Sequence, residues 1–582
     1  MMSRQSQRAY IIYLIMLLSS SSMWAQSLTQ NSISTIAKSD PLIITGAIGT
    51  QNTFYNSSMG SGYRSPWANT LSANLNIQLY GISMPFAFYY SNNNKSFSFP
   101  HFSFHIDPTY KNWRGHFGRS SMGMSSYIMN MSFYGVGLEY NDEKLRFGAF
   151  YGELRNAIND DPSNPSARQP QYRRMGWGVK VGYGSGRNYL DLYLIRAYDR
   201  LNSIDEYWQQ KIDPQENVAI GLKGGLGVTN WLTLRGNLGF SAFSKDFRAQ
   251  KIKSATLDKW DKIFEARYSS LMRIAGDVSA NVNLKNFNTS VFYRMVQPDY
   301  TTLGLYYMSN NYQSLGINMS TTLLKKLSIS GTFSGQEDNI TRNQLYTTRG
   351  FVYSANASMP VTQQLHMSIG YSGYRQVQSD GKAKVNDTTR VDRVMNTLFL
   401  TPSYTIEGDR MDHVFALSFN YSDNKDLNRF AKGESDVKTL AAGLSYSLGL
   451  KELEMDVTTS FSHQQSTGYN TKYSSEVLSV GTGRSFLKDK SLNVSAGLSL
   501  CYNNIKNQQR MLSLGADMSA SYTLKAHMFS FNANFNKYSD TNLSADNSSM
   551  GATEITLSLG YTYTFSLLEI KKKGKMNGDK EK

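Results

Sequence analysis

Long stretches of alternating apolar and polar residues constrain the fold of this chain more than any other feature. Between residues 492 and 502 every second residue is apolar, and Asn, Ser, Gly and Cys fill the positions between them. The same alternation covers residues 512–524, 71–79 and 365–371. Because successive side chains of a strand point to opposite faces, each stretch predicts a strand with one apolar and one polar face. Strands of about ten residues exceed those of most soluble sheets and match the length that crosses a bilayer.

The connections between these strands alternate between short turns and long polar loops. Tight turns occur at residues 141–144, 185–188 and 487–490, and longer loops lie around residues 157–172 and 378–391. This rhythm is typical of bacterial barrels, in which the short turns face the periplasm. Counting strands between the turns gives about 24, with about 22 to 26 allowed by boundary error. We therefore expect an all-β fold, a single transmembrane antiparallel β-barrel over residues 42–566, with both termini in the periplasm.

The N-terminus has the features of a secretory signal. Arg4 and Arg8 precede an apolar run over residues 9–18, and a serine stretch leads to the small residue Ala25. The order of charge, apolar core and small residue predicts a signal peptide over residues 1–25 rather than a buried helix. The apolar core is too short for a transmembrane helix, which needs roughly 20 residues. Residues 26–41 then form a short periplasmic segment before the first strand.

The composition supports one uniform β-rich unit. Tyr (38), Phe (29) and Gly (45) are abundant, and the whole chain has only 12 prolines. The mean hydropathy is negative, which suits a barrel because only alternate residues face lipid. A soluble β-sandwich or propeller is the alternative, but sandwich strands are shorter and no blade repeat is found. Cys501 is the only cysteine, so the chain has neither an intrachain disulfide nor a cysteine metal cluster.

The formal charge is +16, and it falls to +14 without Arg4 and Arg8. Nucleic acid is an unsuitable partner for an exported barrel, whereas outer-membrane lipids, lipopolysaccharide or an anionic solute would match this charge. Part of the excess comes from a basic tail over residues 567–582, which we expect to be solvated in the periplasm.

The last predicted strand carries a local signature. Apolar and aromatic residues alternate from Ile555 to Phe565, and the strand ends in Gly560-x-x-Tyr563-x-Phe565. This ending resembles the β-signal that the bacterial barrel-assembly machinery reads on outer-membrane proteins. It departs from the usual pattern because 17 residues follow Phe565.

Residues 94–130 interrupt the strand rhythm and are dense in aromatic and ionisable residues. Long loops of this kind are uncommon and are usually functional, so we expect an insertion that plugs or narrows the lumen, the alternative being a surface loop packed by its own aromatic residues. The residues that would form the plug or constriction are His101, His105, Asp107, Lys111, Arg114, His116 and Arg119. A metal site formed by the three histidines and Asp107 is a second alternative, but the spacing fits no zinc pattern. No motif selects a nucleophile with its base, so we expect neither an enzyme nor a bound cofactor.

Two segments carry a family resemblance. The run from His116 to Gly152, with Phe133-Tyr134-Gly135-Val136-Gly137 and Leu145-Arg146-Phe147-Gly148 within it, resembles large porin-like outer-membrane barrels of Bacteroidetes. The segment from Pro298 to Tyr307 is similar to another recurrent stretch of those proteins. The resemblance implies a barrel in the outer membrane of a Gram-negative bacterium but no settled activity.

Two functions remain open. The first is a porin-like channel or transporter for hydrophilic solutes or a polypeptide, because side chains no longer fill barrels of 16 strands and more. The alternative is a structural or assembly barrel that anchors a surface complex, such as one with a surface lipoprotein, or forms part of a secretion apparatus. We do not expect TonB-dependent uptake, because residues 26–41 are too few for the plug domain that it requires.

Overall fold

The structure is a computed structural model that describes residues 42–60, 65–80, 82–92, 102–159, 169–253, 261–431, 433–487, 489–542 and 549–570. The signal peptide, the segment 26–41, His101 and the tail from residue 571 lie outside these ranges, so the predictions for them stay predictions. No helix in the described part of the chain has the length and the apolar character needed to cross a membrane.

The described residues form strands almost throughout. The first half of the chain contains β1 (Leu42–Ser57), β2 (Trp67–Leu79), β3 (Ile82–Ser91), β4 (Phe102–Ile106), β5 (Thr109–Tyr110), β6 (Trp113–Ser120), β7 (Phe133–Asn141), β8 (Leu145–Arg155), β9 (Arg174–Ser185), β10 (Asn188–Asp199), β11 (Glu216–Gly227), β12 (Leu232–Ser244), β13 (Ser270–Asn283) and β14 (Phe287–Val296). The second half contains β15 (Tyr312–Leu323), β16 (Leu327–Asp338), β17 (Tyr346–Pro360), β18 (Leu365–Asp380), β19 (Asp392–Glu407), β20 (Met411–Asp426), β21 (Val437–Leu450), β22 (Met455–Gly468), β23 (Lys472–Phe486), β24 (Leu492–Ile505), β25 (Gln509–Leu524), β26 (His527–Asn542) and β27 (Ser549–Ile570). Between β10 and β11 lie a 3-10 turn, η1 (Leu201–Ser203), and one helical turn, α2 (Glu206–Gln209).

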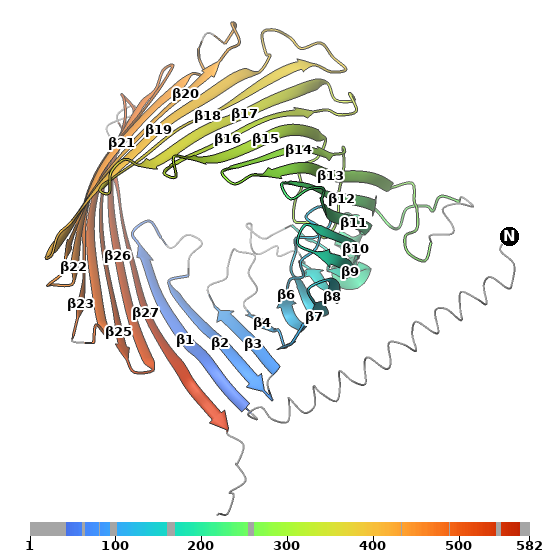
Figure 1. Ribbon diagram of the computed structural model, residues 1–582, viewed down its shortest axis with the longest axis horizontal. Helices are drawn as coiled ribbons and strands as arrows, with labels where there is room; N and C mark the ends of the chain where they lie inside the picture. The colour runs from blue at the N-terminus through green and yellow to red at the C-terminus, as the bar shows by residue number, and fades with distance from the viewer. Residues whose placement is uncertain are drawn as a thin grey trace, which may run out of the picture.

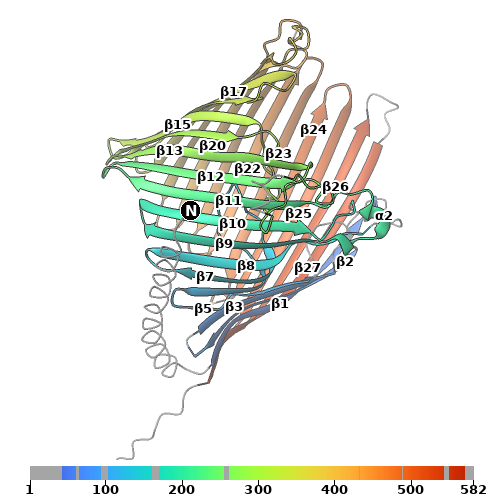
Figure 2. The same cartoon turned by 90° about the vertical axis from the view of Figure 1, so that its right-hand side faces the viewer.

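The strands form one closed antiparallel barrel (Figure 1). Each strand pairs with its neighbours in sequence, and β1 pairs with β27 from Leu42↔Ile570 to Ser57↔Glu554. β4 and β5 both lie between β3 and β6, so they share one position in the wall. The 27 strand elements therefore make a 26-strand barrel, which confirms the predicted fold class and lies within the predicted range of strand numbers. Seen from the side, the strands run obliquely across the wall (Figure 2).

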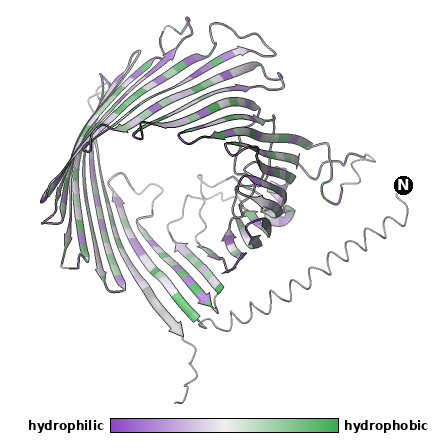
Figure 3. Cartoon of the chain, in the orientation of Figure 1, coloured by the Kyte–Doolittle hydropathy of each residue, from purple (hydrophilic) through white to green (hydrophobic). Residues whose placement is uncertain are grey.

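Alternation along each strand separates an apolar exterior from a polar interior, and the colours of successive residues alternate accordingly (Figure 3). In β24 and β25, Leu498 and Ala516 are paired on the exterior, where Leu498 is 61% exposed. Three positions along, Ser495 and Ser519 are paired on the interior, with their hydroxyl oxygens 2.6 Å apart. A wall of this kind presents a continuous apolar surface outside and hydrogen-bonding groups inside.

The two rims of the barrel differ. Short turns such as residues 142–144 and 525–526 lie on the rim where β1 begins and β27 ends, and long connections such as residues 200–215 lie on the other. Aromatic residues gather on the exterior near the short-turn rim, as in the pairs Trp113–Tyr140 and Phe415–Tyr446. Aromatic girdles of this kind flank the apolar band of membrane barrels.

Two predicted boundaries differ from the structure. β27 runs to Ile570, beyond the predicted barrel end at residue 566. The prediction of one inserted loop over residues 94–130 is wrong for residues 102–120, which belong to the wall as β4, β5 and β6. Phe102, Phe104 and Phe117 lie on the exterior face of these strands and the ionisable residues lie mostly on the interior face, so the stretch follows the same alternation as the other strands.

Candidate functional site: the lumen and its inner layer

Two connections fold into the barrel and pack against each other. We call residues 121–132, between β6 and β7, and residues 297–311, between β14 and β15, the inner layer. A parallel bridge joins Met129 to Gly304, and the amides of Asn130 and Met131 both donate to the carbonyl oxygen of Gly304, at 3.0 and 3.1 Å. The Tyr300 hydroxyl donates to the carbonyl oxygen of Tyr127 at 2.7 Å. The inner layer is therefore one hydrogen-bonded unit built from segments about 170 residues apart.

The inner layer covers the interior face of only part of the wall. Ile128, Met129 and Leu303 are at most 3% exposed and pack in one apolar cluster with wall residues of β7 to β12. The wall residues in this cluster are Phe133, Phe150, Leu154, Tyr193, Ile195, Ala197, Ala219 and Phe243. Among the described residues that follow Leu305 in the sequence, no hydrophobic side chain is buried. Burying this apolar surface stabilises the docked inner layer, because each fully buried large side chain contributes about 1.5–3 kcal/mol.

Glycines in the wall make room for the inner layer. Gly221 in β11 and Gly239 in β12 are paired on the interior face. A Cβ atom on Gly239 would lie 2.6 Å from the hydroxyl oxygen of Tyr300 and 2.8 Å from the Cβ of Tyr127. On Gly221 it would lie 3.0 Å from the Cδ1 of Ile128. Since heavy atoms in contact are normally 3.5–4.0 Å apart, a side chain at Gly239 would push the inner layer away from the wall.

Polar wall residues bind the inner layer in addition to the apolar contacts. Asn217 is fully buried in β11, and its side-chain oxygen accepts a hydrogen bond from the amide of Leu303 at 3.1 Å. The Tyr127 hydroxyl donates to Asp277 in β13 at 2.6 Å. Burial and this carboxylate raise the pKa of Tyr127, and burial raises the pKa of Tyr300. Both phenols therefore keep their protons, and their donated hydrogen bonds, beyond the pH at which an exposed tyrosine ionises.

A buried cluster of charged groups lies on the interior face beside the inner layer. His116 is 1% exposed, and its two ring nitrogens lie 3.3 Å from Asp107 Oδ1 and 2.9 Å from Glu139 Oε2. Lys180 in β9 forms an ion pair with Glu139 and lies 3.5 Å from the carbonyl oxygen of Gly123 in the inner layer. Because carboxylates only accept hydrogen bonds, His116 satisfies both when each ring nitrogen carries a hydrogen.

The structure brings together some of the residues predicted for a plug or constriction and separates others. Asp107, Arg114 and His116 belong to the buried cluster, and Arg114 donates to Asp107 at 2.7 Å. His105 lies in β4 and Lys111 in the turn after β5, while Arg119 lies at the long-connection end of β6. His101 lies outside the described residues. Among the described residues, no group of three or more His, Cys, Asp or Glu side chains is placed to hold a metal ion, so the metal alternative receives no support from them.

Sequence reasoning missed residues 297–311 and the wall residues that bind the inner layer. In the sequence, the segment 298–307 is distinguished only by its resemblance to other barrels. A usable signal was present in the glycines at interior positions of neighbouring strands, such as Gly178, Gly221 and Gly239, each of which would meet the inner layer if it carried a Cβ. Interior glycines on adjacent strands indicate that something approaches the wall closely.

The rest of the interior face is not covered in this way. From β13 to β18 it carries hydroxyl and amide side chains, which line two open hollows of about 370 and 320 Å³. The polar residues that line one or both of these hollows include Asn281, Asn288, Ser290, Asn318, Ser320, Ser330, Thr332, Ser354 and Asn356. A wall of 26 strands about 4.8 Å apart and tilted by about 40° has a diameter of about 50 Å if it is circular. Side chains from the uncovered wall are far too short to fill such a lumen.

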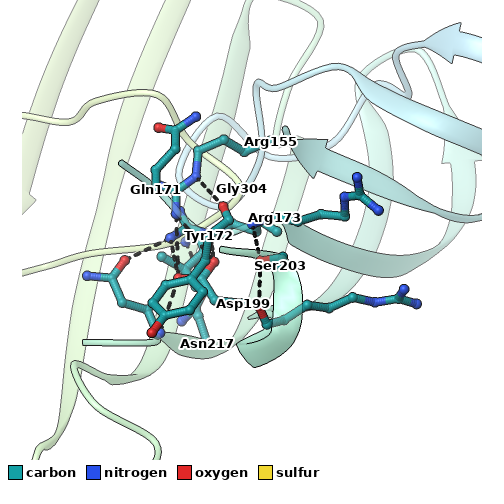
Figure 4. Close-up of polar contacts among 12 residues, drawn as sticks. Arg155, Gln171, Tyr172, Arg173, Asp199, Ser203, Asn217 and Gly304 are labelled. Carbon is teal, nitrogen blue, oxygen red and sulfur yellow. Dashed lines mark hydrogen bonds and ion pairs between the residues drawn. The ribbon is translucent and has the colours of Figure 1, made fainter. Parts of the chain in front are cut away.

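At the long-connection rim, a hydrogen-bonded network ties the wall to the connections (Figure 4). Asp199, 1% exposed as a side chain, accepts from Arg174 at 2.8 and 3.1 Å and lies 3.4 and 3.5 Å from Arg155. The Tyr172 hydroxyl donates to backbone oxygens of the connection between β10 and β11, and the Ser203 hydroxyl accepts from the amide of Arg173 at 2.9 Å. Two arginines thus share one buried carboxylate, so this group of three side chains has a net positive charge.

No family model matches the chain, and no curated protein matches it. Several solved structures of outer-membrane barrels are similar to it. OccAB2 of Acinetobacter baumannii is 12% identical with a TM-score of 0.29, over 61% of this chain and 93% of that one. PapC in the Escherichia coli P pilus tip assembly intermediate PapC-PapD-PapK-PapG is 11% identical with a TM-score of 0.44, over 91% of this chain and 61% of that one. The outer-membrane protein opdK of Pseudomonas aeruginosa is 8% identical with a TM-score of 0.28, over 61% and 94%.

Proposed function

We propose that the protein is an outer-membrane channel for hydrophilic solutes, which pass between the inner layer and the uncovered interior face of β15–β27. The observation that carries this proposal is the one-sided inner layer. It packs against the wall from β7 to β12 and against the long-connection halves of β13 and β14, whereas the interior face beside it, as far as β18, presents Ser, Thr and Asn side chains to the lumen. Hydroxyl and amide groups exchange hydrogen bonds with water and with polar solutes alike, which is what passage of a hydrophilic molecule requires.

The proposed orientation places the short-turn rim and both termini in the periplasm and the long connections outside the cell. The aromatic pairs near the short-turn rim support it, as does the position of the start of β1 and the end of β27 on that same rim. Export through cleavage after Ala25, and contact of the exterior with lipopolysaccharide, belong to this proposal. So does recognition of Gly560, Tyr563 and Phe565 by the barrel-assembly machinery.

The single cysteine provides a direct test of an aqueous lumen. Cys501 lies on the interior face of β24, paired with Val477 and Ser513, and is partly exposed. We expect purified protein in planar bilayers to conduct, and a positively charged methanethiosulfonate reagent to reduce that conductance by modifying Cys501. The matched control is Cys501→Ser, whose conductance should not respond. A second control moves the thiol to the exterior, Leu500→Cys combined with Cys501→Ser, where lipid should protect it.

Absence of conductance from a protein whose gel mobility still shifts on heating would contradict the channel. A closed barrel that retains a surface lipoprotein through purification would instead support the structural or assembly role. If the protein were extracted without detergent and did not change mobility on heating, its membrane location would be wrong.

A further inference from the structure

A hollow of about 760 Å³ opens at the long-connection rim, where the chain leaves the wall to form the inner layer. We call this hollow the rim notch. Its lining includes Arg119 at the end of β6, Tyr134 at the start of β7, Arg155 at the end of β8 and Arg173 just before β9. The notch exists because β6 and β7 stop pairing at Ser120↔Phe133, while the chain between them turns into the lumen.

Three arginines line the rim notch, and the ion pairs that two of them form are 3.4 and 3.5 Å long. Arg119 has no ion-pair partner among the described residues. Arg155 shares Asp199 with Arg174, which binds the same carboxylate more closely. Arg173 lies 3.5 Å from Glu153 and keeps 46% of its side chain exposed. Among the described residues that line the notch, three arginines and the single carboxylate of Glu153 leave an excess of two positive charges.

Aromatic groups border the same hollow. Phe102, Tyr134 and Tyr306 are 48%, 43% and 67% exposed, and Tyr306 approaches from the inner layer. Exposed aromatic rings beside cationic groups suit a ligand that combines an apolar or aromatic body with an anionic group.

We propose that the rim notch binds a phosphate-bearing organic molecule, with Arg119, Arg155 and Arg173 on the phosphate and Phe102, Tyr134 and Tyr306 against its apolar body. Guanidinium groups form paired, charge-assisted hydrogen bonds with phosphate oxygens. The excess of two positive charges matches the charge of a phosphate monoester, which is about −1.5 to −2 near neutral pH, better than the single charge of a carboxylate. The notch is lined both by Tyr134, on the exterior face of the wall, and by Tyr306, from the inner layer, so the phosphate belongs either to a lipid headgroup or to a soluble solute. Binding does not require conduction, so this inference goes beyond the proposed channel.

The test uses the full-length mature protein in dodecylmaltoside. Isothermal titration calorimetry with phenyl phosphate should detect binding that weakens with added salt, because the arginines are partly exposed. Arg119→Gln and Arg173→Gln should each weaken it about tenfold, and the double variant about a hundredfold. The matched control is Arg342→Gln, an exposed arginine of the same rim paired with Glu337, which should bind as the unaltered protein does.

Native mass spectrometry with dioleoyl phosphatidic acid and dioleoyl phosphatidylcholine identifies the source. Selective retention of phosphatidic acid, competing with phenyl phosphate, supports a lipid headgroup, and binding of phenyl phosphate alone supports a soluble solute. Three results would overturn the proposal: binding of neither phosphate probe, equal binding by the double variant, or tighter binding of benzoate than of phenyl phosphate.

Discussion

Replacement of Asn217 by alanine tests whether the inner layer is held as a unit against the wall. Its side-chain oxygen is the acceptor for the Leu303 amide, and its side-chain nitrogen donates within the wall, to Ser241 at 2.7 Å and to the carbonyl of Ala242 at 2.9 Å. Only the bond to Leu303 is lost when the inner layer leaves the wall. The free-energy difference between docked and undocked forms therefore depends on that bond.

In Asn217→Ala, the Leu303 amide stays buried without an acceptor, since Leu303 is 3% exposed. An unsatisfied buried donor costs about 1–3 kcal/mol. We therefore expect the undocked population of residues 297–311 to rise about 5- to 150-fold. Hydrogen-exchange mass spectrometry should detect this as faster exchange in peptides covering 297–311, while peptides from β24 stay unchanged.

The matched control is Asn318→Ala, because Asn318 accepts from Thr332 within the uncovered wall and does not contact the inner layer. Amide exchange of residues 297–311 in the Asn318→Ala variant should equal that of the unaltered protein. If Asn217→Ala left this exchange unchanged, or if both variants accelerated it equally, the inner layer would not be anchored as described.

Three further predictions follow from the same contacts. Gly239→Ala should displace the inner layer and cost about 1–3 kcal/mol through overpacking, whereas Gly483→Ala, whose Cβ would have its nearest neighbour at 3.8 Å, should be neutral. The measurement is the midpoint temperature of the heat-induced shift in gel mobility, and equal midpoints for the two variants would refute the steric argument. Because the pKa values of Tyr127 and Tyr300 are raised above 10, their contribution to docking should be complete below pH 10 and be lost above it as the undocked phenols ionise, so amide exchange of residues 297–311 should become faster at alkaline pH. The Tyr127→Phe, Tyr300→Phe double variant should lack this acceleration. If the acceleration persisted in the double variant, it would arise from other groups. Glu139→Gln removes the carboxylate shared by His116 and Lys180 and should lower the free energy of unfolding by about 3–5 kcal/mol. Glu452→Gln, in an exposed pair with Arg410, should change it by less than about 1 kcal/mol. Similar changes in the free energy of unfolding of the two variants would contradict the burial of the cluster.

Much of the wall could be predicted because its physics is local. Leu498 and Ser499 point to opposite faces whatever the rest of the chain does, so alternation alone identifies β24. Residues 102–120 were harder to assign. Their interior face carries His105, Asp107 and His116 instead of Ser or Asn, which hid an exterior face that alternates normally.

The inner layer could not be predicted because its contacts join distant segments. Ile128 and Leu303 are apolar residues in connections, where neither period two nor helical spacing indicates what they pack against. Their burial depends on the wall being closed around them. The rim notch is non-local in the same way, since Arg119, Arg155 and Tyr306 meet only after three separate connections have folded.

The pairing of β1 with β27 has a consequence for the kinetics of folding. The other strand pairings of the wall join strands that are adjacent or next but one in the sequence, but this one joins residues 42 and 570. Closing a loop of that length costs about 3 kcal/mol more entropy than closing a hairpin of a dozen residues, and nothing repays it until both strands are complete. The barrel therefore exists for most of its assembly as a curved sheet with two unpaired edges, which invite pairing with other chains. Its folding yield should depend on how well those edges are shielded before the seam forms.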